Sequence, residues 1–243
     1  MQPDRFHPAP TAFHSCHKWP ATPCVTRTRP AAFRLSLAFI LVSTVLISLS
    51  GCTKIEQGIA VLSHDVTTRL SKAPAGIYRA DPDHISVHFS LSHLGYSQFT
   101  GRFDTIDISL DLKPDDPLES MMDVRIPLQS VNSGSSTIDD ILRTDLFDLA
   151  RYPEIHFTAE SIRSQNGVDG TIEGQLEMNG RRRPIRLEVT FNGYAKNPLT
   201  GAPTLGFSAR TRLDRSAFGL GKWSPAVGHE VAIMIEAELI HQP

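Results

Sequence analysis

Four side chains that can bind metals or move protons lie close together in the sequence: Asp81, Asp83, His84 and His88. Histidine and aspartate are common metal ligands and general bases, so this group can serve a metal site or part of a hydrolytic site. The residues around them alternate between apolar and polar types, which places His84 and His88 on the polar side with three serines. We therefore expect both histidines to point outward.

His93 falls on the apolar side of the same segment, where it is alone among apolar residues. A single histidine in such a place is more often a hydrogen-bonded structural group than a catalyst. The chain contains no G-x-S-x-G, H-E-x-x-H, glycine-rich phosphate loop or paired-cysteine site in its usual context. We therefore expect no metal site and no enzyme; the alternative is an envelope hydrolase or metal-dependent enzyme that uses these histidines.

Residues 35–52 read LSLAFILVSTVLISLSGC, an apolar run that ends in a cysteine, Cys52. Basic residues precede the run, at Arg27, Arg29 and Arg34. This layout is typical of a bacterial export signal, and the run is shorter than the ~20 apolar residues of a membrane-spanning helix. The last four residues resemble the lipobox of lipoproteins. The resemblance implies that residues 1–51 are removed and that Cys52 becomes the lipidated first residue.

Removal of residues 1–51 changes the charge and the cysteine content. The full chain has 26 acidic and 24 basic residues, and the removed part holds one of the former and five of the latter, leaving 25 and 19 and a net charge near −6. This excess of acid argues against nucleic acid as a partner. Only Cys52 remains, so no intramolecular disulfide can form. Thr53 after Cys52 favours the outer membrane, in a lipoprotein that faces the periplasm.

Downstream of Cys52 the period of the apolar residues indicates one helix and then a series of strands. Residues 54–70 show helical spacing, which predicts an amphipathic tether within 52–75. From residue 76 to 243 the period is two. It predicts eight strands, at 85–93, 103–112, 122–126, 155–162, 172–178, 185–191, 205–213 and 231–239. Asn166-Gly167 and Asn179-Gly180 predict two-residue hairpins, and Ser135 or Ser136 is expected to cap one short helix over 137–149.

Eight antiparallel strands expose two edges unless they close, so we expect an all-β, antiparallel eight-stranded barrel with one short helix. A barrel of this size is either filled by side chains or holds one small ligand. Phenylalanines recur on the apolar faces, at Phe89, Phe103, Phe157, Phe191 and Phe207, with Phe99, Phe218 and Trp223 on adjoining segments. These rings are compatible with a packed core and with a long apolar cavity.

Several short motifs occur in order between Tyr78 and Leu239. They are YRADPDH at 78–84, F-x-L-x-H-x-G at 89–95, LFD at 146–148, YPEIHF at 152–157, LEMNG at 176–180, DRSAFGL at 214–220 and VGHEV at 227–231. Together they resemble the YceI-like family. Asp214 and His229 depart from the pattern, which usually has Asn and Asp there, and we expect these departures to affect only local hydrogen bonds.

The resemblance implies a lipocalin-like barrel whose tunnel binds a long isoprenoid or other amphiphilic lipid, such as a polyprenyl chain or an isoprenoid quinone. No cofactor is needed. The expected ligand-binding residues are Val87, Phe89, Leu91, His93, Tyr96, Phe99, Phe103, Phe157, Phe191, Phe207, Phe218 and Trp223. His93, Tyr96, Arg143 and Trp223 are candidates for the polar end. A homodimer that buries a protruding tail is a further expectation, and a solidly filled structural protein of the envelope is the alternative.

Overall fold

The computed structural model describes residue 58 and residues 60–243. All described residues belong to one compact unit, Thr53–Pro243. The predicted export signal and Cys52 lie outside the described residues. Among the residues described, no helix is both long and apolar enough to cross a membrane.

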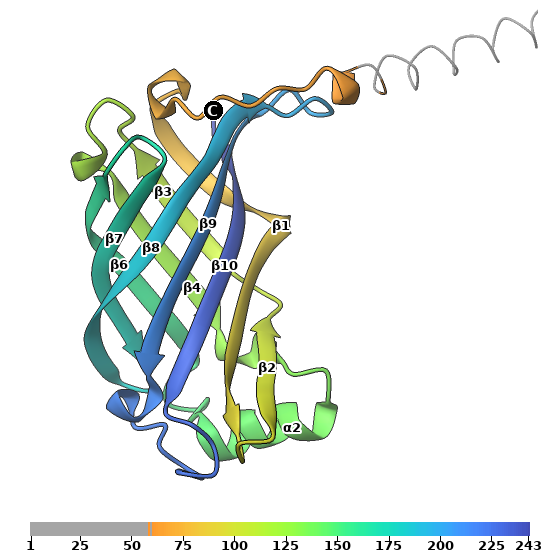
Figure 1. The fold of residues 1–243 in the computed structure, drawn as a ribbon, viewed down its shortest axis with the longest axis vertical. Helices are drawn as coiled ribbons and strands as arrows, with labels where there is room; N and C mark the ends of the chain where they lie inside the picture. The colour runs from red at the N-terminus through yellow and green to blue at the C-terminus, as the bar shows by residue number, and fades with distance from the viewer. Residues whose placement is uncertain (1–57, 59) are drawn as a thin grey trace, which may run out of the picture. The chain divides into compact units, whose positions relative to one another are not determined.

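Ten strands form one antiparallel sheet, and eight of them close into a barrel (Figure 1). The strands are β1 Gly76–His93, β2 Ser97–Phe103, β3 Asp107–Leu112, β4 Met121–Pro127, β5 Val131–Asn132, β6 Glu154–Ser164, β7 Asp169–Met178, β8 Arg181–Lys196, β9 Pro203–Asp214 and β10 Glu230–His241. The ring runs β1-β10-β9-β8-β7-β6-β4-β3 and returns to β1, while β2 and β5 extend from β1 outside the ring. The predicted closed antiparallel barrel of eight strands is confirmed.

Strand β1 closes the ring because it pairs with the last strand along most of its length. Its partners on β10 run from Tyr78 opposite His241 to Ser90 opposite Ala232, with an irregularity between Ala80 and Ile85. Its other edge first pairs with β3 and then, from Val87, with β2. Figure 1 shows β1 and β2 curving away from the barrel at the end where α2 lies.

One short helix, α2 Ser136–Ile141, lies at that end and continues into a π-helical turn, η4 Leu142–Leu146. The predicted helix therefore exists but ends three residues before residue 149. Ser135 occupies the N-cap position without a capping side-chain bond. Other single turns are η1 Leu70–Lys72, η2 Pro117–Glu119, η3 Leu128–Ser130 and η5 Arg215–Phe218.

The prediction of one strand over 103–112 is wrong. Strand β2 ends at Phe103, and the chain leaves the sheet before β3 begins. The cause is a change in the phase of the apolar residues, which fall on Phe103 and then on Ile106 and Ile108. Asp104 marks the break, because its carboxylate accepts hydrogen bonds from Arg102 and Asn132.

Only one of the two predicted two-residue hairpins forms. Asn179 and Gly180 both have positive φ, +53° and +68°, as a tight primed turn requires. Between β6 and β7 the connection has four residues, and of its Asn-Gly pair only Gly167 has positive φ, at +85°. The longer loop is stabilised by Asn166, whose side-chain oxygen accepts from the N–H groups of Val168 and Asp169.

The predicted helix over 54–70 is wrong in its second half. Within the described residues the helix ends at Leu62, and the chain then becomes extended. Thr67 and Tyr194 exchange two backbone hydrogen bonds, of 3.0 and 2.9 Å, so this segment joins the edge of β8. The β-branched sequence Val66-Thr67-Thr68 favours this extended state over the helical one.

Tyr78 is the largest fully buried side chain and lies where β1 begins. Its hydroxyl donates to the carbonyl of Pro74 at 2.8 Å, and its ring contacts the edge of His241 with centroids 5.0 Å apart. Burial, with a smaller effect from Tyr194, raises the pKa of Tyr78 from 10.0 to about 12. This residue therefore joins the start of the barrel to its last strand.

Replacing Tyr78 with Phe should remove the last phase of the alkaline absorbance titration of the four tyrosines. The folded protein holds the phenolic proton to a pKa of about 12, whereas the unfolded chain releases it near 10.0. Stability is therefore complete below pH 10 and falls as pH rises from about 10 to 12. Tyr78→Phe should also cost about 1 kcal/mol at neutral pH, through the lost hydrogen bond. In Tyr96→Phe, an exposed control, the last phase should persist; its persistence in Tyr78→Phe would contradict the assignment.

Candidate functional site

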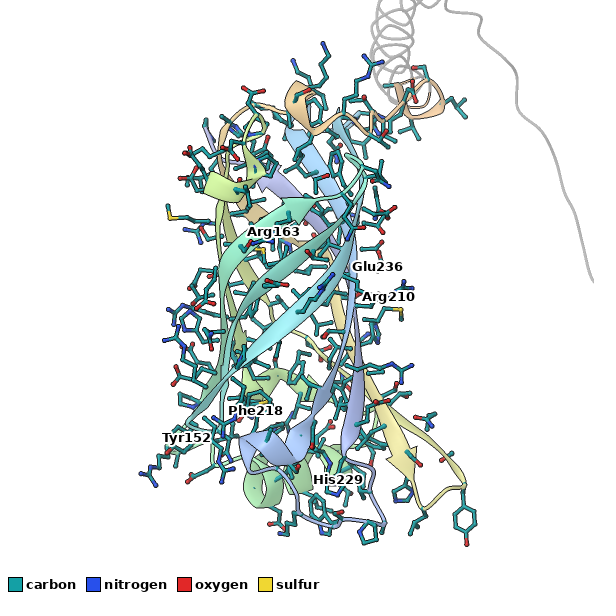
Figure 2. The ribbon with its side chains drawn as sticks, turned by 60° about the vertical axis from the view of Figure 1, so that its left-hand side comes forward. Tyr152, Arg163, Arg210, Phe218, His229 and Glu236 are labelled. Carbon is teal, nitrogen blue, oxygen red and sulfur yellow. The ribbon has the colours of Figure 1, made fainter. Side chains whose placement is uncertain are left out.

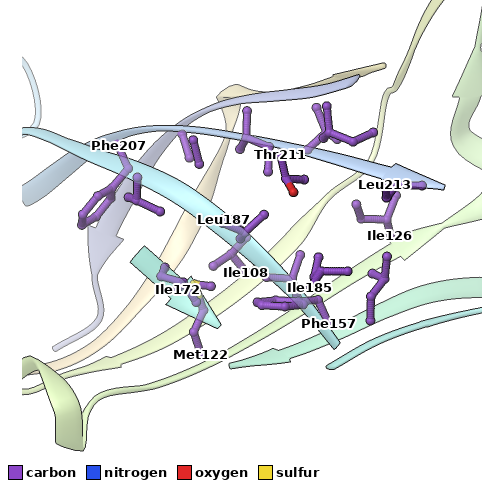
Figure 3. Close-up of a pocket in the computed structure, with 18 of the residues that line it drawn as sticks. Ile108, Met122, Ile126, Phe157, Ile172, Ile185, Leu187, Phe207, Thr211 and Leu213 are labelled. Carbon is purple, nitrogen blue, oxygen red and sulfur yellow. The ribbon is translucent and has the colours of Figure 1, made fainter. Parts of the chain in front are cut away.

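The barrel encloses a cavity of about 320 Å³ whose wall is made almost entirely of apolar side chains. Alternation along each strand turns every second residue inward, so the ring strands all contribute to this wall. Figure 3 draws 18 of the lining residues and labels Ile108, Met122, Ile126, Phe157, Ile172, Ile185, Leu187, Phe207, Thr211 and Leu213. The interior surface is therefore mostly hydrocarbon, with few groups that can form hydrogen bonds.

Aromatic rings gather in two places along this wall. Phe89 lies between Phe99 and Phe103, with ring centroids 6.3 and 5.6 Å away, and Phe191 lies 5.3 Å from Phe207. The Phe89 ring covers Gly101 on the neighbouring strand, where an added Cβ would come within 2.4 Å of its Cζ. Glycine at this position thus lets the ring lie flat along the wall.

Polar lining groups are concentrated toward the two ends of the tunnel. One end is formed by the β6–β7 hairpin and η2 and presents Arg163, Ser164, Asp169 and Ser120. At the other end, η4 contributes the apolar Leu142 and Leu146, and the polar lining groups are the guanidinium of Arg215 and the indole N–H of Trp223. Figure 2 shows Arg163 and His229 toward opposite ends of the barrel.

Arg215 is the one guanidinium among the described residues that is buried, with 4% of its surface exposed. It donates to the carbonyl oxygens of Gly228 and Val227, each at 2.7 Å, to Lys222 at 3.0 Å, and to Leu220. Burial lowers the pKa of Arg215, and Asp214 partly opposes this effect. One side chain therefore holds the loop between η5 and β10 across the end of the tunnel.

The sequence of this barrel matches the model of the YceI-like domain over residues 78–239. The chain belongs to the YceI-like family. Protein YceI of Escherichia coli O17:K52:H18 is 30% identical over 173 residues, covering 70% of this chain and 90% of the relative.

Solved structures share the fold. BcnA of Burkholderia cenocepacia is 21% identical with a TM-score of 0.59, covering 65% of this chain and 98% of BcnA. A polyisoprenoid binding domain from Saccharophagus degradans is 13% identical with a TM-score of 0.53, covering 70% of this chain and all of that domain. At these identities the likeness shows the fold alone.

Nine of the twelve residues expected to bind ligand line the tunnel of the YceI-like barrel. They are Val87, Phe89, Leu91, Phe99, Phe103, Phe157, Phe191, Phe207 and Trp223. Their position is what binding an apolar chain requires, and their role in binding stays a prediction.

The other three expected residues lie outside the lining, as does Arg143. His93 and Tyr96 are exposed, Tyr96 at 89%, because the β1–β2 hairpin extends beyond the ring and its tip no longer has an inner side. The expectation that His93 faces inward is therefore wrong. Phe218 is buried in the hydrophobic core and is not among the residues that line the tunnel. Arg143 donates to the carbonyls of Gln129 and Val131 and so fastens α2 to the chain before it.

Sequence reasoning missed most of the aliphatic wall and the buried arginine. Residues such as Ile172, Leu187 and Val189 already stood on the apolar sides of predicted strands, and the alternation alone identifies them. Arg215 gave no such signal, because a single arginine next to a turn is usually solvated.

One group on the outer surface has side chains that can hold a metal ion. Asp81, His84 and Glu238 each offer a ligand atom, and these atoms lie within 4.8 Å of one another. The irregularity in β1 brings Asp81 and His84 to a 3.0 Å hydrogen bond opposite β10. Burial opposes ionisation of Asp81, but the hydrogen bonds from His84 and Asp83 still lower its pKa. His84 is exposed, as expected, and forms an ion pair with Asp81 when its ring is protonated.

Replacing Arg215 with Met should lower the free energy of unfolding by more than about 3 kcal/mol, because four carbonyls would lose their donor. Urea denaturation measures this change. The matched control is Arg210→Met, which removes an exposed guanidinium paired with Glu188 and should cost less than about 1 kcal/mol. Equal losses in the two variants would show that Arg215 does not organise the loop.

Proposed function

We propose that this protein binds a long isoprenoid or other amphiphilic lipid, such as a polyprenyl chain or an isoprenoid quinone, inside the barrel. The observation that carries the proposal is the tunnel wall, which is apolar along its length and has polar groups concentrated toward its ends. Such a surface gains free energy from burying hydrocarbon and offers little to a polar ligand.

The length of the ligand follows from the energy of burial. Each buried CH₂ contributes about 0.8 kcal/mol, so a tail of several isoprene units outweighs a modest ordering cost. The polar head then lies at an end of the tunnel. Arg163 and Ser164 at the hairpin end, and Trp223 at the other end, are the lining residues with donors in the right place.

The shared fold supports the same class of ligand. The Saccharophagus domain is described as polyisoprenoid binding, and its fold matches that of this chain. At 13% identity, no residue role of that domain is assigned to this chain, and the class of ligand is inferred from the apolar wall. A cavity of about 320 Å³ also speaks against a solidly filled structural barrel.

The proposal includes a place in the cell envelope. We infer that Cys52 is lipidated and holds the barrel at the outer membrane, facing the periplasm, where ligands with long apolar tails reside. Carriage, storage or sensing of the lipid are the roles this location serves. Pairing of two barrels over a protruding tail is part of the proposal, and sedimentation of the lipid-loaded protein as a monomer would remove that part.

Organic extraction of the purified native protein followed by mass spectrometry should recover a polyprenyl lipid or quinone. Leu187→Trp should lower the recovered amount several-fold, because the larger ring fills the middle of the tunnel. The matched control is Met234→Trp, which adds the same ring at an exposed position and should leave the lipid in place. Circular dichroism verifies that both variants fold. A wild-type protein that is lipid-free and also refuses added polyprenol or quinone would refute the proposal.

Replacing Cys52 with Ser should release the barrel from membranes without emptying it. The change removes the proposed attachment and touches no residue of the tunnel wall. Cell fractionation should find the variant in the soluble periplasmic fraction, with an unchanged melting temperature and unchanged lipid content. If the lipid disappeared together with the anchoring, Cys52 would have a role beyond attachment.

A further inference from the structure

Three side chains at the α2 end of the barrel lie in a row in space: a serine, a histidine and an aspartate. The hydroxyl of Ser224 lies 2.5 Å from Nε2 of His229, and Nδ1 of His229 faces Oδ1 of Asp214 at 4.0 Å. Each ring nitrogen of the histidine thus faces the partner that an activated serine requires. Figure 2 shows His229 at this end, near α2.

The loop that carries Ser224 is held in place from several sides. The four carbonyls bound by Arg215 belong to residues before and after Ser224. Lys222 reaches across to the carboxylate of Asp145 at 3.2 Å, and the N–H of Leu94 donates to Ala226. A nucleophile needs such support, because activation depends on keeping the serine and its base at a fixed distance.

Ser224 is exposed to solvent and adjoins the tunnel. Trp223, immediately before it, and Val227, three residues after it, both line the tunnel, as does Arg215 beneath. A ligand whose apolar chain occupies the tunnel would therefore bring its head group to this loop.

We propose that Ser224 is a nucleophile activated by His229, and that its substrates are carboxylic esters with a long apolar chain that lies in the tunnel. The choice of substrate rests on the proposed function, whereas the reactivity of Ser224 does not. Asp214 is a positioning residue, which orients the imidazole.

The reaction proceeds in two steps, acylation of Ser224 and hydrolysis of the acyl-serine. Oγ of Ser224 attacks the ester carbonyl carbon while Nε2 of His229 takes the hydroxyl proton. Collapse of the tetrahedral intermediate breaks the bond between the carbonyl carbon and the alcohol oxygen, and His229 gives its proton to the departing alcohol. Water then attacks the acyl-serine, with His229 taking one proton and returning it to Ser224, so that the carboxylic acid is released.

Asp214 is prepared for its role by its neighbours. Its Oδ1 accepts two hydrogen bonds from Ser216, one from the backbone N–H at 2.8 Å and one from the side-chain hydroxyl at 2.6 Å. The hydrogen bond from the Ser216 side chain, followed by that from its backbone, lowers the pKa of Asp214, so the carboxylate is charged at neutral pH. His229 Nδ1 lies 4.0 Å from Asp214 Oδ1, so a side-chain rotation of about 1 Å in the substrate complex would bring the two atoms to hydrogen-bond distance.

Labelling with a fluorophosphonate probe tests the nucleophile without using the tunnel. The probe loses fluoride and forms a phosphorus–oxygen bond, and peptide mass spectrometry should locate it on Ser224. His229→Asn should slow labelling at least about 100-fold, whereas His88→Asn, which removes an exposed histidine on β1, should not change it. Asp214→Asn should also slow the labelling of Ser224. Asp214→Glu should retain the labelling, because the longer side chain can reach Nδ1 of His229. Labelling absent from Ser224, or unaffected by His229→Asn, would overturn the proposal.

A comparison of two esters separates this proposal from the proposed lipid binding. Hydrolysis of p-nitrophenyl butyrate and of p-nitrophenyl laurate should depend on Ser224 and be unchanged in the exposed variant Met234→Trp. Leu187→Trp should lower the hydrolysis of laurate several-fold more than that of butyrate. Equal rates for laurate in wild type and Leu187→Trp would overturn the assignment of long-chain esters while the labelling result stands. The double variant D214N/H229D carries the residues usual in the YceI-like motif. It should fold and lose the hydrolysis of both esters.

Discussion

A barrel that surrounds a cavity cannot be held together by packing across its middle. Here a cavity of about 320 Å³ lies inside the ring, so the buried side chains around it lack packing partners on that side. The continuous ring of backbone hydrogen bonds must supply the order that central packing would otherwise give. Strand β1 shows the demand most clearly, because it pairs with β10 on one side and with β3 and then β2 on the other.

The ends of the barrel face a different demand, because loops carry backbone groups that must find partners. At the α2 end a single buried guanidinium, Arg215, satisfies four loop carbonyls. Within residues 58 and 60–243, no buried side-chain nitrogen or oxygen lacks a partner. The tunnel can therefore stay apolar right up to a polar loop, which is the arrangement that a ligand with a long tail and a small head requires.

Alternation along the chain was enough to predict the closed barrel and most of its inward positions, because a period of two fixes which side chains share a face. It failed where strands change phase or leave the ring: at Asp104, where β2 ends, and at His93, whose hairpin projects past the wall. The helix predicted before the barrel is longer than the observed one, because Thr67 pairs with the edge of β8. This is a long-range contact that local spacing cannot reveal. The trio of Ser224, His229 and Asp214 matches no sequence motif, since its members meet only when β9 and β10 are paired.

The pairing of β1 with β10 also determines when the barrel can close during synthesis. The two strands stand at the beginning and the end of the barrel sequence, so the ring cannot close until the last strand has been synthesised. Contacts so distant in sequence fold slowly. Until β10 has been made, the lining residues therefore belong to an open, incomplete sheet, and the tunnel does not yet exist. A barrel closed by its final strand cannot enclose a ligand before residues 76–241 are complete.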